Sequence, residues 1–424
     1  MEVKIEKMDD LGRGITYILG KVTFVPYTIT GDIVDITVTK NKKKYNEAKV
    51  NKFIAASPNR ITPICPYFTK CGGCTLQSMS YENTITYKKE KVENIFNKNK
   101  IATSFEVVEN PTPYHYRNKI TLKIVEGTIG FYTDKTHQIV GITSCAISND
   151  AINEALFLVP NFHIKNGTIS IRCNQNSEIL FTIDTNDTLN IDIEAIKEKI
   201  KLVGIVLNNK PYYGEDYLFE RINHMLFKIS YDSFFQVNPN VASKMFQIVG
   251  DNITHNDKVL DLYCGVGTFS LTAAKKAHEV VGIEIVPNAI LNAIYNASLN
   301  DLTNVHFVLN DVSTAILQMP LDFTKVIVDP PRSGLDKNTI DNILKINPKT
   351  IIYISCDPQT LVRDCKLLES KYTVEKVYVL DMFSYTYHVE CCALLGLKET
   401  EKVEEKQDEP KTTNAQKINK KNNL

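Results

Sequence analysis

The pattern of apolar and polar positions divides the chain into stretches of different character. From about residue 15 to 55, the short β-rich runs ITYILGKVTFVPY and GDIVDITVTK are separated by the turn signal TITGD and followed by the basic loop NKKKY. This pattern predicts a small antiparallel β-barrel. Residues 105–235 are again mostly strand-like with turn punctuation, which indicates a second, β-rich region.

From about residue 240 the pattern changes to strands that alternate with helices. Seven strand-like runs, among them KVLDLYC, EVVGIEIV, KVIVD and TIIYIS, are joined by helical stretches and predict an α/β fold with a mainly parallel sheet. Before the β-rich region, YENTITYKKEKVENIFNK places its apolar residues on one helical face. The sequence thus predicts four parts: a barrel at 1–56, a central domain at 57–238, a catalytic domain at 239–397 and a disordered, apolar-poor tail at 398–424.

Composition narrows the class of protein. The 424 residues are 43% apolar, which is more than one hydrophobic core accommodates. The charged start MEVKIEKMDD is unlike a signal peptide, and no apolar run reaches the length of a membrane span, so we expect a cytoplasmic protein with no membrane association. Ten cysteines in such a chain indicate metal binding or catalysis, because the cytosol keeps thiols reduced.

Positive charge is concentrated in the N-terminal third. The net charge is zero, yet the first 150 residues carry 21 Lys and Arg against 15 Asp and Glu, a surplus of six. The basic loop contains Lys40, Lys42, Lys43 and Lys44 beside Tyr45, a set that suits a nucleic-acid backbone. From the loop alone, a solvated hairpin turn is an equally good interpretation.

A glycine loop in VLDLYCGVGTFSLTAA is typical of cofactor binding. Gly265 and Gly267 lie where a strand turns sharply into a helix and lets a ligand approach. Glu284 ends the next strand, 23 residues after Asp261, at a distance suited to ribose hydroxyls. Ser270 replaces the third glycine that a pyrophosphate would need, which favours S-adenosylmethionine over NAD.

Further acidic residues follow later strands. Asp311, in VLNDV, lies where the adenine amino group would be met, although it could equally cap the following helix. Asp329 begins DPPRSG at the carboxyl edge of the sheet, where ligands bind in open α/β folds. Arg332 occupies the place that an aromatic residue takes in a related motif for exocyclic amines, so methylation of an amine is disfavoured.

Cys356, in YISCDPQT, follows a strand at the same edge and has the chemistry of a nucleophile. C5 of a pyrimidine is a poor nucleophile, and a thiolate that attacks C6 makes C5 electron-rich. A base must then remove the C5 proton, and Glu390, with His388 close by, is the candidate. A lone Cys or Glu is more often packing or surface, but the order of these motifs on successive strand ends favours an active site.

The segment CPYFTKCGGC predicts a metal centre. Cys65, Cys71 and Cys74 have C-x5-C-x2-C spacing, and Cys145 is the nearest remaining cysteine for a fourth ligand. Four thiolates suit tetrahedral zinc or an iron–sulfur cluster, and the spacing leaves both open.

Together these motifs resemble the RNA uracil-5-methyltransferase family over nearly the whole chain up to Gly396. The segment LGRGITYILGKVTFVPYTITGD looks like a TRAM domain, an OB-like RNA-binding barrel, and SYDSFFQVNP is similar to the family's FFQxN motif. The resemblance implies a Rossmann-like catalytic domain and a helix at 80–100 that packs on it. It also implies a [4Fe–4S] cluster at the four cysteines. The site residues that it implies are Gln236, Tyr263, Glu284 and Asp329 near the cofactor and target, Cys356 as nucleophile and Glu390 as base.

The resemblance also implies a substrate. Family members with both a TRAM domain and a cluster tend to act on large-subunit ribosomal RNA, so we expect a monomer that methylates a 23S rRNA loop uridine. The alternatives are a tRNA uridine, a cytosine C5, for which DPPC is more usual than DPPR, and a cluster-bearing RNA-binding protein without catalysis. Two departures stand out, since the family commonly reads SCNP and PHTxHVE where this chain has Asp357 and Ser384–Tyr385.

Overall fold

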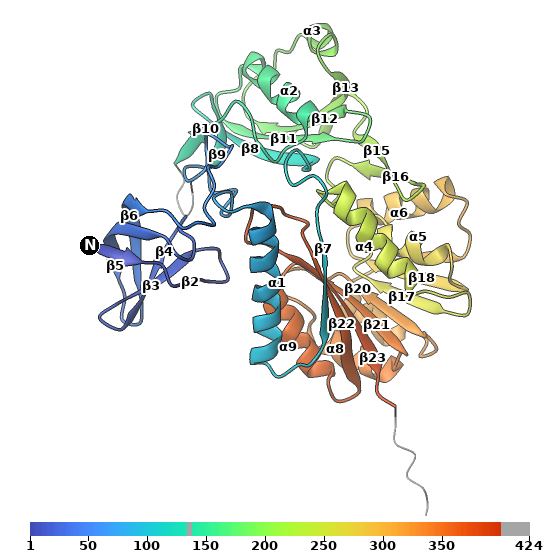
Figure 1. Ribbon diagram of the computed structural model, residues 1–424. Coiled ribbons are helices and arrows are strands. Elements are labelled where there is room, and N and C mark those ends of the chain that lie inside the picture. Colours follow the sequence, from blue (N-terminus) through green and yellow to red (C-terminus); the bar gives the residue numbers. More distant parts are fainter. Residues whose placement is uncertain (134–137, 400–424) are drawn as a thin grey trace, which may run out of the picture.

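The computed structural model describes residues 1–133 and 138–399, so the predicted tail lies outside the described residues from residue 400 onward. Figure 1 shows three regions: a small sheet that contains the N-terminus, a second sheet at the top of the view, and a larger layered domain below it. No helix among the described residues is long and apolar enough to cross a membrane.

The N-terminal region is a closed barrel. Its strands, in the order β1-β5-β6-β4-β3-β2, are β1 (Glu2–Lys4), β2 (Lys7–Met8), β3 (Gly14–Ile18), β4 (Lys21–Val25), β5 (Ile33–Asn41) and β6 (Asn46–Ala55). The two ends of this order, β1 and β2, are consecutive pieces of one segment, which therefore joins β5 on one side and β3 on the other. The predicted barrel is confirmed, with the difference that β4 and β6 pair in parallel.

The central region is a seven-stranded sheet in the order β10-β9-β8-β11-β12-β13-β14. Its strands are β8 (Lys119–Val125), β9 (Thr128–Tyr132), β10 (Ile139–Gly141), β11 (Gly167–Cys173), β12 (Glu178–Thr185), β13 (Lys201–Leu207) and β14 (Lys210–Gly214). It is accompanied by α2 (Asp150–Leu158), the 3-10 helix η1 (Val159–Phe162) and α3 (Ile193–Lys197). A two-stranded hairpin, β15 (Tyr217–Ile222) with β16 (Met225–Ser230), then leads toward the larger domain.

The larger domain has an eight-stranded sheet in the order β19-β18-β17-β20-β21-β23-β22-β7. The strands are β7 (Ser104–Val108), β17 (Lys258–Leu262), β18 (Glu279–Glu284), β19 (Val305–Leu309), β20 (Lys325–Val328), β21 (Thr350–Ser355), β22 (Tyr372–Leu380) and β23 (Glu390–Leu397). All neighbours pair in parallel except β23, which is antiparallel to both β21 and β22. The predicted α/β fold with a mainly parallel sheet is confirmed.

Helices cover both faces of this sheet. One face packs against α4 (Pro239–Asp251), α5 (Thr268–Ala274) and α6 (Pro287–Leu299). The other packs against α1 (Tyr81–Lys98), α7 (Val312–Ala315), η2 (Ile316–Gln318), α8 (Lys337–Ile346) and α9 (Pro358–Leu368). Each layer buries a continuous apolar core, which makes the sheet a rigid support for the loops at its edge.

The eighth strand comes from a distant part of the sequence. The sequence pattern places seven strands after residue 240, whereas β7 precedes the central sheet and pairs in parallel with β22. The helix before it, α1, buries Val92, Ile95 and Phe96 in the same core as the eight-stranded sheet. Figure 1 shows α1 beside β7. Short alternating runs such as SFEVV do not encode which sheet they join, because that choice depends on long-range packing.

Candidate active site

The candidate residues lie along one edge of the eight-stranded sheet. They follow or begin strands in the spatial order β19, β18, β17, β20, β21 and β23. The corresponding residues are Asp311, Glu284, Tyr263 with Gly265, Asp329, Cys356 and Glu390. This order puts most of the residues predicted to bind the cofactor toward one end of the edge and the predicted nucleophile toward the other.

The glycine loop has backbone angles that leave room for a ligand. Gly265 has a φ of 55°, and a Cβ at this position would meet nothing within 4 Å. Gly267 has a φ of 86° and begins α5, and its Cβ would lie 2.8 Å from Leu271. Tyr263 has a φ of 65°, which is strained for a tyrosine. The positive φ at both positions, together with the crowding at Gly267, explains why both are glycine.

Backbone N–H groups hold the Glu284 carboxylate beside this loop. The Gly265 N–H donates to it at 3.1 Å, and the N–H groups of Ile285 and Val286 donate at 2.8 and 2.9 Å. The carboxylate is therefore fixed between the glycine loop and the start of α6, where ribose hydroxyls are expected.

Asp261, beneath the glycine loop, is a buried carboxyl group that sequence reasoning did not single out as a candidate. It is fully buried, and the Ser270 hydroxyl donates to its Oδ2 at 2.5 Å. Its Oδ1 is buried and has no hydrogen-bond partner among the described residues. Burial raises the pKa of Asp261 to about 7. The serine that replaces the third glycine thus binds one oxygen of a buried carboxyl group, while the other oxygen has no hydrogen-bond partner among the described residues.

Two further predicted cofactor residues have local roles in the structure. Asp311 is exposed and caps α7, because its Oδ1 accepts from the Thr314 N–H at 3.2 Å and the Ser313 hydroxyl at 2.5 Å. The Ser313 hydrogen bond is the main cause that lowers the pKa of Asp311. Gln236 is buried, and its backbone carbonyl accepts from the Asn118 side-chain amide at 3.2 Å. The cap interpretation of Asp311 therefore holds, and the capping hydrogen bonds all go to its Oδ1.

The nucleophile end contains a thiol, two carboxyl groups and one guanidinium. The register of Ser355 with Cys391 places Cys356 opposite Glu390, one step beyond the last strand pair. Burial raises the pKa of Cys356, the Glu390 charge raises it further, and Arg332 lowers it. Arg332 therefore favours a thiolate at Cys356, a role that sequence reasoning missed.

The two carboxyl groups hold protons more tightly than usual. Burial raises the pKa of Glu390 well above its ordinary value, with the Asp329 charge as the next cause and Arg332 acting in the opposite direction. Burial raises the pKa of Asp329 to about 7. Acids so close together titrate as a pair, so at least one proton resides on them near neutral pH.

The barrel forms one wall of the pocket at Cys356. This pocket, of about 210 Å³, is lined by Cys356, Arg332 and His388, and also by Asp10 and Leu11 from the N-terminal barrel. The Gln359 amide donates to Asp10 at 3.4 Å, across the junction. Burial is the main cause that lowers the pKa of His388 to about 4, which leaves a neutral imidazole near neutral pH.

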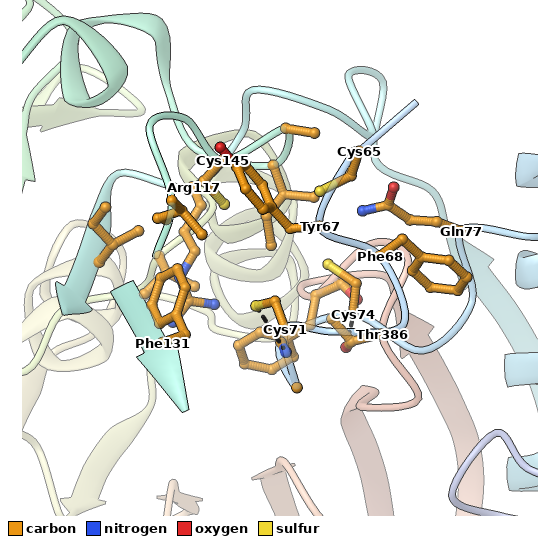
Figure 2. Close-up of a pocket in the computed structure, with 18 of the residues that line it drawn as sticks. Cys65, Tyr67, Phe68, Cys71, Cys74, Gln77, Arg117, Phe131, Cys145 and Thr386 are labelled. Carbon is orange, nitrogen blue, oxygen red and sulfur yellow. Dashed lines mark hydrogen bonds between the residues drawn. The ribbon is translucent and has the colours of Figure 1, made fainter. Parts of the chain in front are cut away.

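The four predicted metal-binding cysteines line one cavity. The cavity, of about 450 Å³, is bordered by Cys65, Cys71, Cys74 and Cys145, and Figure 2 shows their sulfur atoms around a shared space. Burial, and next the Cys145 charge, raise the pKa of Cys74 to about 12. Within residues 1–133 and 138–399, no group of three or more His, Cys, Asp or Glu side chains is arranged to hold a metal ion.

The same cavity also touches the catalytic loops. Arg332, Phe383, Thr386 and His388 also line it, and Figure 2 shows Thr386 beside Cys74. Arg332 and His388 therefore border both the cysteine cavity and the pocket at Cys356. The two sites share a wall although their sequences are far apart.

The two departures from the family motifs have local explanations. Asp357 caps α9 by accepting from the Gln359 N–H at 2.9 Å, a role that asparagine fills equally well. The Ser384 hydroxyl donates to Asp381 at 2.5 Å, and Tyr385 stacks on Tyr114 with ring centres 4.4 Å apart. Both substitutions leave the loop supported.

Comparisons with known proteins agree with this geometry. A family model described as tRNA (uracil-5-)-methyltransferase matches residues 146–398, and one for the TRAM domain of tRNA (uracil(54)-C(5))-methyltransferase matches residues 1–59. An uncharacterized RNA methyltransferase of Halalkalibacterium halodurans is 33% identical and covers 94% of this chain and 97% of its own. An uncharacterized RNA methyltransferase of Caldanaerobacter subterraneus is 34% identical and covers 93% of this chain and 98% of its own.

A solved structure is similar over almost the whole fold. The crystal structure of Pyrococcus abyssi tRNA (uracil-54, C5)-methyltransferase in complex with S-adenosyl-L-homocysteine superposes with a TM-score of 0.78 at 26% identity, covering 93% of this chain and 100% of that chain. The chain belongs to the family of S-adenosylmethionine-dependent RNA (uracil-5-)-methyltransferases, with an N-terminal TRAM domain.

Proposed function

We propose that this enzyme transfers a methyl group from S-adenosylmethionine to C5 of a uridine in 23S ribosomal RNA, through a covalent bond from Cys356 to the base. The main support is the order of groups along the sheet edge, with the glycine loop and Glu284 at one end and Cys356 and Glu390 at the other. Asp329, on the strand between them, lies where the methyl donor and the target base would meet.

The cofactor fits the first half of this edge. S-adenosylmethionine supplies an electrophilic methyl group on a sulfonium, and it carries an ammonium that matches the unpaired oxygen of buried Asp261. Glu284 accepts the ribose hydroxyls, and the open space at Gly265 admits the ligand. The remaining proposed binding residues are Gln236, Tyr263, Asp311 and Asp329, each on the same edge or in the segment that precedes α4.

The protein's own residues act on the target uracil in three steps. The Cys356 thiolate adds to C6 of uracil, and the electron pair of the C5–C6 double bond moves toward the O4 carbonyl, which makes C5 nucleophilic. After C5 has received the methyl group, the Glu390 carboxylate removes the C5 proton. The electron pair of that C–H bond re-forms the double bond, and the thiolate leaves C6. Arg332 favours the thiolate at the start and end of this cycle.

We propose that the cysteine cavity holds a [4Fe–4S] cluster. Four thiols gather there, and thiolates are the ligands of such clusters. Tetrahedral zinc would require sulfurs about 3.8 Å apart, as follows from a Zn–S bond of about 2.3 Å. The C-x5-C-x2-C spacing with Cys145 as a distant fourth cysteine resembles the family's cluster site and is the reason for favouring the cluster over zinc. Anaerobic purification tests this: brown protein with bound iron and sulfide supports the cluster, and colourless protein with stoichiometric zinc overturns it.

The proposed RNA substrate is 23S rRNA. The combination of a TRAM barrel and a four-cysteine site favours 23S rRNA within the family. Transfer RNA is the second candidate, because both the matching TRAM model and the Pyrococcus abyssi enzyme are described as acting on tRNA uracil-54. In either case the uridine must leave its stack to expose C5 and C6. The basic turn between β5 and β6 is available to contact the RNA backbone.

The decisive experiment uses purified protein and labelled S-adenosylmethionine. It is incubated separately with 23S rRNA and tRNA transcripts, and any 5-methyluridine is mapped. We expect label at C5 of a 23S uridine, and label in tRNA alone would overturn the ribosomal assignment. A Cys356→Ala variant that still methylated RNA would refute covalent catalysis by this residue.

A further inference from the structure

Four asparagines recur at every fourth position along α6 and its C-terminal cap: Asn288, Asn292, Asn296 and Asn300. Their side-chain amides face β16 and the segment that follows it. We call this set the asparagine ladder. Asn292 and Asn296 are buried, at 3% and 0% exposure, so their amides need partners inside the protein.

Two rungs bind the backbone of β16. The Asn300 amide accepts from the Leu226 N–H at 2.9 Å and donates to the Leu226 carbonyl at 2.8 Å. Asn296 does the same with Lys228, accepting at 2.6 Å and donating at 3.2 Å. Each side chain thus pairs with one residue of the strand in the way that a neighbouring strand would.

The other two rungs bind side chains at the end of β16 and in the segment that follows it. Asn292 exchanges hydrogen bonds with the Ser230 hydroxyl at 3.0 and 3.1 Å and donates to the Ser233 hydroxyl at 3.0 Å. Asn288 donates to Asp232 at 2.7 Å. The ladder therefore follows the chain from Leu226 to Ser233.

The spacing of helix and strand explains why the rungs match. Four helical residues advance about 6.0 Å, and two strand residues advance about 6.6 Å. An asparagine amide has the same donor and acceptor as a peptide group. Because β16 belongs to a two-stranded sheet, its outer edge lacks a strand partner, and the ladder takes the place of a third strand.

Asn296 makes an additional contact that points to the cofactor. Its amide also donates to the Val266 carbonyl at 3.1 Å, between the two glycines of the cofactor loop. One buried side chain thereby joins β16 to the glycine loop. The Asn300 side-chain amide instead makes its second donated hydrogen bond to the backbone carbonyl of Asn296, within the same helix.

The segment after β16 is held from its other side by the central domain. Arg172, on β11, donates to the carbonyls of Ser230 at 3.3 Å and Ser233 at 2.7 Å. Phe235, two residues further, packs in the same core as Val266. Gln236, the proposed cofactor residue, follows directly.

We propose that Asn296 is a positioning residue for the cofactor: through the ladder it fixes the glycine loop against the segment that carries Gln236. The proposal rests on the cofactor site of the proposed function. It predicts that loss of the Asn296 amide weakens binding of S-adenosylhomocysteine, while loss of a rung that lacks the Val266 contact does not.

The test compares Asn296→Leu with the matched control Asn300→Leu. Leucine is similar in volume, and each variant removes one rung from the β16 backbone, but only Asn296→Leu removes the bond to the glycine loop. Binding of S-adenosylhomocysteine is titrated calorimetrically well below the melting temperature of each variant. The fitted stoichiometry reports the folded fraction, and the dissociation constant reports the site.

We expect Asn296→Leu to raise the dissociation constant about tenfold, as the loss of a buried hydrogen bond predicts, with near-normal stoichiometry. The KM for S-adenosylmethionine should rise in parallel and the KM for RNA should not. Asn300→Leu should lower the melting temperature and change the dissociation constant by less than about twofold. Equal dissociation constants for the two variants would overturn the proposal.

A third variant separates this inference from the site on which it depends. If Glu284→Ala binds S-adenosylhomocysteine as the wild type does, the proposed cofactor site is wrong. If Glu284→Ala abolishes binding and Asn296→Leu has the same affinity as the wild type, only the positioning role is wrong.

Discussion

Replacing Lys88 by methionine tests how α1 supports the catalytic loop. Lys88 is 1% exposed, and its ammonium contacts Asp381 at 2.5 Å and donates to the Phe383 carbonyl at 2.8 Å. Burial is the main cause that lowers the pKa of Lys88, and Asp381 opposes it. The pair joins a helix from the N-terminal half to the start of the loop that leads to Glu390.

The loss of stability expected for Lys88→Met depends on the hydrogen bonds that Asp381 keeps. Breaking a buried ion pair by removing one partner costs about 3–5 kcal/mol, because the other charge stays buried. Asp381 would retain hydrogen bonds from Tyr81 at 2.8 Å and Ser384 at 2.5 Å. We therefore expect the lower end, about 3 kcal/mol. Methylation should also slow by on the order of tenfold or more, since a displaced loop misplaces Glu390.

The assay is urea denaturation followed by circular dichroism, because the chain contains no tryptophan. Lys89→Met is the matched control on the same helix: Lys89 contacts Glu93 at 3.6 Å at the surface, and its loss should cost less than about 0.5 kcal/mol. A Lys88→Met variant that is as stable as this control, within about 1 kcal/mol, would show that the buried pair does not support the loop.

Four other variants test separate parts of the site. Glu390→Gln should accumulate a covalent RNA–protein adduct that survives denaturing electrophoresis, because the C5 proton stays in place; absence of the adduct argues against Glu390 as the base. Asp261→Asn should raise the melting temperature by more at pH 8 than at pH 5: the folded pKa of Asp261, about 7, lies above its ordinary 3.8, so its carboxyl costs stability increasingly as the pH rises from 3.8 to about 7, and a pH-independent difference in melting temperature would contradict this. Asp357→Asn should retain wild-type stability and rate, whereas Asp357→Ala should lose about 1 kcal/mol of cap energy on denaturation; a costly Asn variant would rule out a simple cap. Cys71→Ser should lower bound iron, while Cys173→Ala, which alters a buried cysteine of the central core, should not; equal iron in both would exclude Cys71 as a ligand.

Sequence reasoning predicted the sheet edge well because its signals are local. The strand-like runs that end just before Gly265, Asp329 and Cys356 predict where the strands end. Parallel strands bring such ends to the same edge of the sheet. The same reasoning missed the barrel residue Asp10 at the nucleophile pocket and β7 in the catalytic sheet. Both depend on packing between segments that are distant in sequence, and no local period encodes that packing.

The wall shared by the two cavities decides how the cysteine variants must be interpreted. The N–H groups of Thr75 and Leu76, directly after Cys74, both donate to the Tyr385 carbonyl, at 3.2 and 3.0 Å. Because these are backbone bonds, any displacement of the cysteine loop passes to the loop that ends at Glu390. A cysteine variant that loses activity would therefore not reveal whether a cluster takes part in the chemistry. Bound iron and the affinity for S-adenosylhomocysteine must therefore be measured on the same variant. If a variant lacks iron but binds S-adenosylhomocysteine normally, the cluster acts on Glu390 and on RNA binding rather than on the S-adenosylmethionine site.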